Sequence, residues 1–210
     1  QGPARYVYWK RYDKRMALVE PNLDTRSSGE AASRDSVERI FPDRVLLDVP
    51  IVALGPNKQP VIDLDALLVG NAPQLAGMQL NGRLASIEKA KAFPQNIELS
   101  IKAPNPAGQF MILHYSISEV PERSDYKPRE ADDRIGYFTT DYRDLGLYGT
   151  ETNWKSYIHR WKLEKRDPSP KTIPPKAAIT LYLAPTVPVR YPPSGQDGAP
   201  QCDGAFEAIR

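Results

Sequence analysis

Short segments rich in β-branched and aromatic residues recur along most of the sequence, and turn-forming residues separate them. NIELSIKA (96–103) and FMILHYSI (110–117) are joined by PNPAGQ (104–109), a pattern typical of a β-hairpin. Strand pairs that are close in sequence form antiparallel sheets, because a short loop suffices to join them. The sequence therefore predicts an α+β fold that is mainly β, with antiparallel sheets and a few short helices.

The N-terminal segments predict a second hairpin that carries cations among aromatic rings. RYVYWKRY (5–12) and RMALVE (15–20) flank the turn Asp13-Lys14. Cations beside aromatic rings are typical of sites for single-stranded nucleic acid, but edge strands also use lysine to prevent unwanted pairing. We favour the edge strand, because the net charge is only +2 and no RNA-binding signature is present. The cluster comprises Lys10, Arg11, Lys14 and Arg15 beside Tyr6, Tyr8, Trp9 and Tyr12.

One helix and several further strands are expected between the two hairpins. In RDSVERIF (34–41), Val37, Ile40 and Phe41 have helical spacing, Asp35 is the expected N-cap with Glu38 three residues later, and Pro42 ends the helix. The other expected elements are a buried strand in RVLLDVPIVAL (44–54), a strand that runs into a helical turn in VIDLDALL (61–68), and either a helix or a strand in SIEKAKAF (86–93).

The C-terminal half combines a dense aromatic segment with a proline-rich one. In DDRIGYFTTDYRDL (132–145), a strand would place Ile135 and Tyr137 on one face and Gly136 and Phe138 on the other. A glycine inside a strand suggests a bulge or a closely approaching backbone. The remaining segments are NWKSYIHRWKLEK (153–165), which fits a helix or, as we prefer, a strand; RDPSPKTIPPK (166–176), a linker; and AAITLYLA (177–184), another strand.

No complete catalytic group is found, so no catalytic, cofactor-binding or metal-binding residue is assigned. His114 and His159 would need a carboxylate such as Asp133, and a fold that brings all three together, to bind a metal. A histidine satisfied by a neighbouring group within a sheet is more common, and we favour that interpretation. The weaker candidates are Cys202, which has no histidine nearby in sequence, and the pairs Asp132/Asp133 and Asp141/Asp144, which more often cap turns or pair with Arg134 and Arg143.

The longest apolar run excludes a membrane helix. VLLDVPIVAL (45–54) is interrupted by Asp48 and Pro50 and falls far short of the roughly 20 apolar residues that a membrane helix requires. We therefore expect neither a membrane span nor a nucleic-acid partner.

Several blocks together carry a family resemblance. PVIDLDALL, IEKAKAFPQNIEL, HYSI, DDRIGYFTTDYRDL, YIHRWKLEKRDP and ITLYLAPTVPVRY occur in this order. At these spacings they resemble the uncharacterised domain that precedes the catalytic domain in bacterial Met-zincins, which are exported zinc-dependent metalloproteases. The resemblance implies an accessory domain over residues 1–175 and a truncated or altered start of the protease domain over 176–210. Its motif or interface residues would be Asp133, Arg134, Gly136, Tyr137, Phe138, Tyr157, Arg160, Trp161 and Glu164.

The resemblance also implies a function. A zincin binds zinc through two histidines of an HExxH motif, which this chain lacks, so the zinc would be held by the protease domain of the parent protein. The chain would then be a non-catalytic, exported accessory domain that packs on or covers the downstream protease domain and its peptide substrate site. The alternative is a free-standing β-sandwich module that binds peptide or glycan on an aromatic strip of Tyr8, Tyr12, Tyr157 and Trp161.

Overall fold

The computed structural model describes residues 4–69, 77, 79–120, 125–147, 152–164, 166–167 and 179. The chain divides into two compact units, residues 1–159 and 160–210, and the described helices and strands all belong to the first. The linker expected at 166–176, the strand expected at 177–184, Cys202 and the expected domain boundary at 175/176 lie wholly or mostly outside the described residues. Among the described residues, no helix is both long and apolar enough to cross a membrane.

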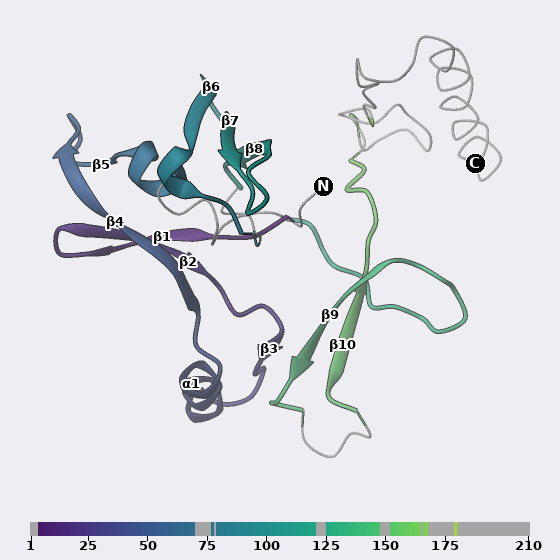
Figure 1. Ribbon diagram of the computed structural model, residues 1–210. Helices are drawn as coiled ribbons and strands as arrows, with labels where there is room; N and C mark the ends of the chain where they lie inside the picture. Colours follow the sequence, from purple (N-terminus) through teal and green to yellow (C-terminus); the bar gives the residue numbers. More distant parts are fainter. Residues whose placement is uncertain are drawn as a thin grey trace, which may run out of the picture. The chain divides into compact units, whose positions relative to one another are not determined.

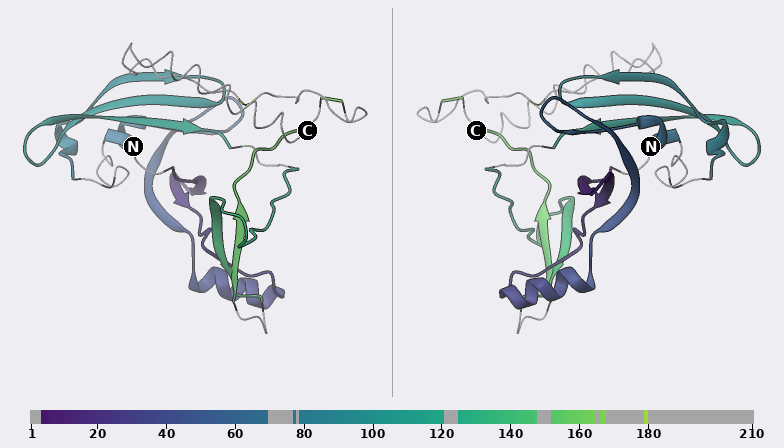
Figure 2. Two further views of the ribbon diagram at one scale, coloured as in Figure 1. Left: turned by 90° about the vertical axis from the view of Figure 1, so that its right-hand side faces the viewer. Right: turned by 90° about the vertical axis from the view of Figure 1, so that its left-hand side faces the viewer.

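The described residues of the first unit form three small sheets, drawn in Figure 1, and the fold is the mainly β, antiparallel α+β fold that was predicted. The first sheet has the order β1 (Tyr8–Tyr12), β2 (Arg15–Glu20), β4 (Arg44–Leu54), β5 (Pro60–Ile62). The second has the order β6 (Ser86–Ala92), β7 (Asn96–Pro104), β8 (Phe110–Ser118), and its strands lie side by side in Figure 2. The third has the order β10 (Trp154–Ile158), β9 (Thr139–Asp144), β3 (Thr25–Arg26), with β3 parallel to β9.

Both predicted hairpins are confirmed, and their turn residues explain them. Asp13 has a positive φ of 48° in the two-residue turn between β1 and β2, a conformation that aspartate tolerates better than most residues. Gly108, with φ 80°, serves the turn between β7 and β8. Residues 86–93, for which the sequence left helix and strand open, contain the strand β6. The strand preferred for residues 153–165 is confirmed, although β10 already ends at Ile158, so Trp161 and Leu163 lie beyond it.

The first two sheets share one hydrophobic core. In β7, Leu99 and Ile101 are fully buried, because every second residue of the strand faces inward. They pack with the buried residues of β2 and β4 and with Leu68 of η1 (Asp65–Val69), the helical turn expected after β5. The whole cluster is Met16, Leu18, Leu47, Val49, Leu68, Leu99 and Ile101. A short 3₁₀ turn, η2 (Gly82–Leu84), precedes β6.

The start of the predicted helix and the predicted burial of the strand over residues 44–54 are wrong. The helix α1 (Ala31–Ile40) begins earlier than expected, with Glu30 as its N-cap, so Asp35 lies inside the helix instead of capping it. The two alanines at its start are strong helix formers, which favours the longer helix. The strand over residues 44–54 is not buried along its length: Leu47 and Val49 are buried, whereas most of its other residues are exposed.

The segment 132–145 is a strand only in its second half. β9 begins at Thr139, and residues 132–138 form a turn and an irregular loop. Gly136 consequently lies outside any strand, and a Cβ atom added there would meet nothing within 4 Å. The expectation that Gly136 marks a bulge or a close backbone contact is therefore wrong.

Candidate interaction surface

The dense aromatic segment leads into the third sheet, where β10 is paired on both sides. On one side lies β9. On the other side, the N–H of Ala131 donates to the carbonyl of Ser156 at 2.9 Å, and the N–H of Ile158 donates to the carbonyl of Arg129 at 3.0 Å. The Lys155 ammonium and the Glu130 carboxylate form an ion pair of 2.8 Å across the same pairing. Residues 129–131 are therefore held beside β10, immediately before residues 132–138.

An ion pair closes the turn that begins this loop. The Arg134 guanidinium donates from Nε to Asp132 Oδ1 at 2.9 Å and from Nη2 to Asp132 Oδ2 at 2.6 Å. The backbone N–H of Arg134 also donates to Oδ1, at 3.1 Å. The Arg134 side chain, followed by its backbone N–H, lowers the pKa of Asp132 to about 2. Asp132 is therefore charged at every physiological pH, and Asp133 is an exposed neighbour in the same turn.

The loop presents apolar side chains to solvent. Ile135, Tyr137 and Phe138 are 55%, 53% and 86% exposed. The backbone is tied at both ends, because the N–H of Ile135 donates to the carbonyl of Asp132 at 2.9 Å and that of His159 donates to the carbonyl of Phe138 at 2.8 Å. We call residues 132–138 the aromatic loop. Scattered exposed apolar residues are common, but here three lie within four positions of one anchored loop.

Tyr157 lies in the sheet and not on the aromatic loop. Its ring stacks on that of Tyr142 with centroids 6.0 Å apart, and the Arg26 guanidinium lies 5.3 Å from the centre of the Tyr142 ring. Burial, followed by the neighbouring Tyr157 phenol, raises the pKa of Tyr142. These three side chains join β3, β9 and β10 across one face of the sheet, so Tyr157 has a structural role there.

The other residues implied by the family resemblance belong to the second unit. Trp161 is exposed, and Glu164 forms an ion pair of 2.8 Å with Lys162. Arg160 begins this unit. The structure therefore unites Asp133, Arg134, Gly136, Tyr137 and Phe138 in one loop and describes Arg160, Trp161 and Glu164 separately. Of the four residues of the alternative interpretation, Tyr8 and Tyr12 lie in the first sheet, Tyr157 lies in the third, and Trp161 belongs to the second unit.

Each histidine has partners within its own part of the fold. His114 contacts Glu98 through Nε2 at 2.6 Å and Ser100 through Nδ1 at 3.3 Å, and His159 Nε2 contacts the Thr140 hydroxyl at 2.7 Å. The interpretation of His114 as a histidine satisfied within a sheet is confirmed. Hydrogen bonds from Ser116 first and His114 second hold the pKa of Glu98 below its usual value. Within the described ranges, no three His, Cys, Asp or Glu residues are arranged to hold a metal.

The acidic residues of the two pairs have local partners: Asp132 lies in a turn, Asp141 lies within β9, and Asp144 is buried at the end of that strand. Asp132 pairs with Arg134, as the sequence suggested, and Asp141 accepts a hydrogen bond from the Thr139 hydroxyl at 3.1 Å. Asp144 is not at a solvated surface: the residue is only 3% exposed. Its Oδ1 accepts hydrogen bonds from the N–H of Ser28 at 2.8 Å and of Gly146 at 3.0 Å. Burial alone would raise the pKa of Asp144, but the hydrogen bonds from Ser28 and Gly146 outweigh it and lower the pKa.

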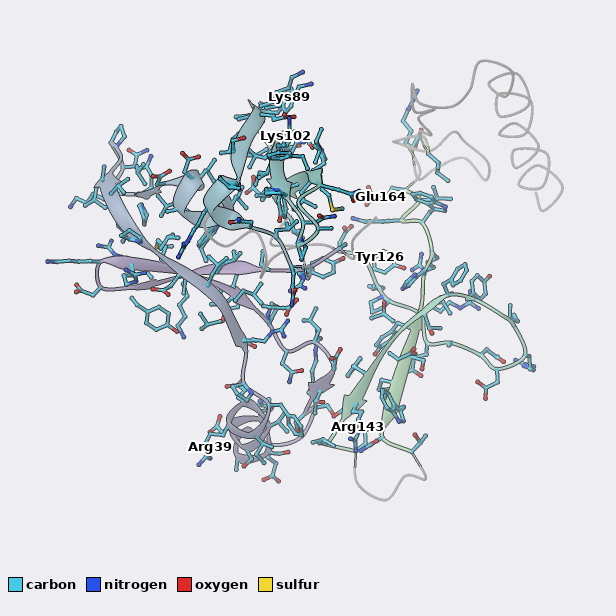
Figure 3. The ribbon with its side chains drawn as sticks, viewed as in Figure 1. Arg39, Lys89, Lys102, Tyr126, Arg143 and Glu164 are labelled. Carbon is cyan, nitrogen blue, oxygen red and sulfur yellow. The ribbon has the colours of Figure 1, made fainter. Side chains whose placement is uncertain are left out.

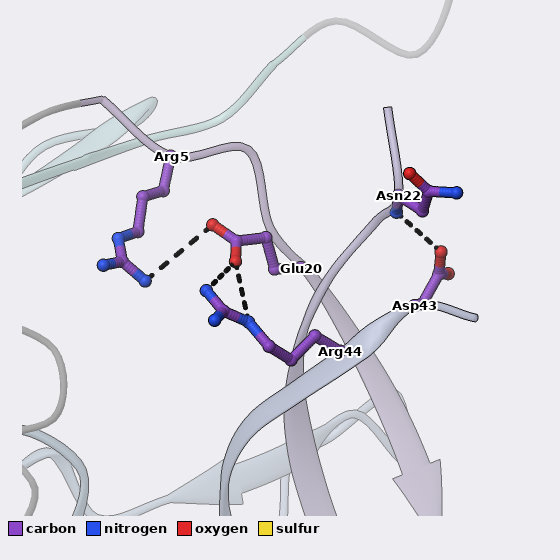
Figure 4. Close-up of polar contacts among 5 residues, drawn as sticks. All are labelled: Arg5, Glu20, Asn22, Asp43 and Arg44. Atoms are coloured by element: carbon purple, nitrogen blue, oxygen red, sulfur yellow. Dashed lines mark hydrogen bonds and ion pairs between the residues drawn. The ribbon is translucent and has the colours of Figure 1, made fainter. Parts of the chain in front are cut away.

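A surface hollow of about 540 Å³ near the N-terminus was not foreseen from the sequence. Figure 4 shows its polar contacts: Glu20 binds both Arg5, at 3.8 Å, and Arg44, and the N–H of Asn22 donates to Asp43 at 2.9 Å. The charged side chains that line it are Arg5, Glu20, Asp24 and Arg44, whose charges balance. The hollow therefore offers no surplus charge that would select a charged ligand.

Comparison with protein-family models finds a match. A family model described as a domain of unknown function (DUF5117) matches residues 1–166, which include the three sheets, α1 and the aromatic loop. No curated protein and no solved structure matches the chain.

Proposed function

The chain belongs to the DUF5117 family of uncharacterised domains, and on that premise we propose that it is a non-catalytic accessory domain of an exported bacterial zinc metalloprotease. Its role is to pack on, or cover, the catalytic domain of the same polypeptide. The observation that carries the docking role is the aromatic loop, which holds Ile135, Tyr137 and Phe138 in solvent on an anchored backbone.

The energetics of association favour such a loop. Aromatic side chains are enriched in interfaces because each buries a large apolar area at a low cost in conformational entropy. The Asp132–Arg134 ion pair and the hydrogen bond from His159 to Phe138 hold the loop before a partner arrives. Less ordering is then required at binding, so more of the contact energy contributes to affinity.

The sequence blocks that resemble the Met-zincin accessory domain support a metalloprotease catalytic domain as the partner. Under this proposal the zinc and the peptide substrate bind in the catalytic domain, which supplies the HExxH motif that this chain lacks. The free-standing peptide or glycan module has less support, because Tyr157, one of its four aromatic residues, is only partly exposed and stacks on Tyr142.

Binding to the separately produced catalytic domain of the same polypeptide tests the proposal. We compare the unmodified chain with a variant that carries Ile135→Ser, Tyr137→Ser and Phe138→Ser, using calorimetry for affinity and peptide hydrolysis for activity. A matched control carries Val52→Ser, Leu54→Ser and Val61→Ser, three similarly exposed apolar residues of β4 and β5. The loop variant is expected to bind at least tenfold more weakly, which corresponds to about 1.4 kcal/mol, and the control is expected to bind normally.

Two results would reject the proposal. Absence of binding, with hydrolysis unchanged by the added chain, would remove the accessory role. Binding that both triple variants weaken equally would place the contact elsewhere and remove the aromatic loop from it.

A further inference from the structure

The strand β1 lies at the edge of the first sheet, and the direction of its backbone groups follows from its neighbours. Tyr12 pairs with Arg15 across the two-residue turn. Arg15 lies opposite Pro50 of β4, which has no N–H, and the N–H of Ile51 donates to the carbonyl of Lys14 at 2.8 Å. The backbone N–H and C=O groups of Arg15 therefore point to β1 and not to β4. Starting from this pair, hydrogen-bonded and non-hydrogen-bonded residue pairs alternate along β1 and β2.

This alternation directs the backbone of two residues away from the sheet. Tyr8, Lys10 and Tyr12 exchange hydrogen bonds with β2, so the N–H and C=O groups of Trp9 and Arg11 point outward. All five residues of β1 are exposed. Within the part of the chain that the structure describes, no strand pairs with the outer side of β1. An open row of donors and acceptors of this kind is a template for an additional strand.

The side chains around this edge are mainly cationic. Arg15 is neutralised by Asp48, but Lys10 lies 5.4 Å from the centre of the Tyr12 ring, and the Arg11 guanidinium donates to a backbone carbonyl, that of Asp13. Arg11 thus keeps its positive charge without a carboxylate among the contacts described. Lys10 acts electrostatically on Asp43, whose carboxylate already accepts a hydrogen bond from the Tyr8 hydroxyl at 2.7 Å, so Lys10 is balanced only in part. Like charges on facing strands repel, so a second copy of this edge is a poor occupant, whereas an acidic strand is complementary.

We propose that β1 binds an extended acidic segment of a partner protein as an added strand of the first sheet. The backbone of that segment pairs with Trp9 and Arg11. A carboxylate lies opposite Lys10, on the face that Lys10 shares with Tyr8 and Tyr12, and an apolar side chain packs beside Trp9 on the other face. Lys10, which disfavours pairing with a second copy of this edge, thereby favours an acidic partner segment. This binding does not depend on the metalloprotease partner proposed above.

The first test uses fluorescence anisotropy with a labelled peptide in which glutamate and valine alternate. We expect it to bind the full chain, and we expect a peptide with lysine in place of glutamate to bind at least tenfold more weakly. N-methylation of every second residue removes the donors on one edge of the peptide only. We expect one of the two N-methylated peptides to lose at least tenfold in affinity and the other to bind nearly as well as the parent.

Three variants locate the site on the chain. Arg11→Pro removes an outward N–H without removing a hydrogen bond to β2, and Arg11→Gln removes the same charge but keeps the N–H. We expect the proline variant to bind at least fivefold more weakly than the glutamine variant. Lys10→Glu is expected to weaken binding tenfold or more. Its control is Lys89→Glu on β6, an exposed lysine on the edge strand of the second sheet, seen with Lys102 in Figure 3.

The N-methylated peptides keep the test decisive even where a variant fails to fold, because they leave the chain unchanged. Failure of the acidic peptide to bind, equal binding of the lysine peptide, or equal loss for both N-methylated peptides would overturn the proposal. So would displacement of the acidic peptide by a single-stranded oligonucleotide together with insensitivity to N-methylation, since the cations would then form a polyanion site.

Discussion

Asp144 accepts a hydrogen bond of 2.8 Å from the backbone N–H of Ser28, although 116 positions separate the two residues. The contact joins the end of β9 to the loop that precedes α1. Around it, the backbones at Gly29 and Gly146 approach so closely that a Cβ on Gly146 would lie 2.8 Å from the nitrogen of Ser28 and 2.9 Å from the Cα of Gly29. The buried carboxylate and the two glycines therefore form one junction between distant parts of the first unit.

Gly146→Ala is expected to destabilise the chain, because the new methyl group would overlap backbone atoms that cannot move without breaking the junction. Overpacking of this kind lowers the free energy of unfolding by roughly 1–3 kcal/mol. Gly136→Ala is the matched control, since a Cβ there meets nothing within 4 Å. Urea denaturation of both variants provides the measurement, and equal stability of the two would contradict the close approach.

Asp144→Asn is expected to lower stability near neutral pH by roughly 1–3 kcal/mol, because buried N–H donors lose a charged acceptor. The pKa of Asp144 is lower in the folded chain than its ordinary 3.8. The stabilisation by the carboxylate is thus present above pH 3.8 and is lost as the pH falls through the folded-state pKa. Urea titrations at decreasing pH should show the unmodified chain approaching the variant in stability, and a constant difference would contradict this linkage.

Leu99→Ala is expected to lower the free energy of unfolding by roughly 2–5 kcal/mol, since the side chain is fully buried in the core that β7 shares with β2 and β4. Ile112→Ala is the control on the neighbouring strand β8, because Ile112 is 63% exposed. Its effect is expected to stay within about 0.5 kcal/mol. Thermal and urea unfolding of the two variants compare them directly, and similar losses would contradict the assignment of the inward face.

Strands whose signal is local were predictable from the sequence. β7 and β8 alternate inward and outward residues and flank a turn that contains Gly108 at positive φ, so the pattern and the turn agree. The end of β5 was also predictable from the sequence, because the apolar residues at strand spacing are followed there by the helical turn η1. In each case the residues that determine the structure are neighbours in the chain.

Features that depend on side-chain contacts were not predictable in this way. Ile135, Gly136, Tyr137 and Phe138 resemble a strand by their alternation. The pairing of Asp132 with Arg134 was expected from the sequence, but hydrophobic periodicity does not show that residues 132–138 form a turn and a loop before β9. The burial of Asp144 depends on Ser28, which is far away in sequence. Gly146, two residues after Asp144, was the one local signal, since an aspartate followed by a glycine favours a turn closed by the carboxylate.

Arg134→Gln tests the turn that presents the aromatic loop. The guanidinium is the main cause of the low pKa of Asp132, about 2, so its removal should return this pKa toward the ordinary 3.8. Because the folded-state pKa is depressed, the ion pair contributes above pH 3.8 and is lost as the pH falls toward 2. The carboxyl ¹³C shift of Asp132, followed by NMR against pH, measures the change. Arg15→Gln, which breaks the ion pair with Asp48 on the first sheet, is the control and should leave Asp132 unchanged. An unaltered titration of Asp132 in Arg134→Gln would show that the turn does not depend on this ion pair.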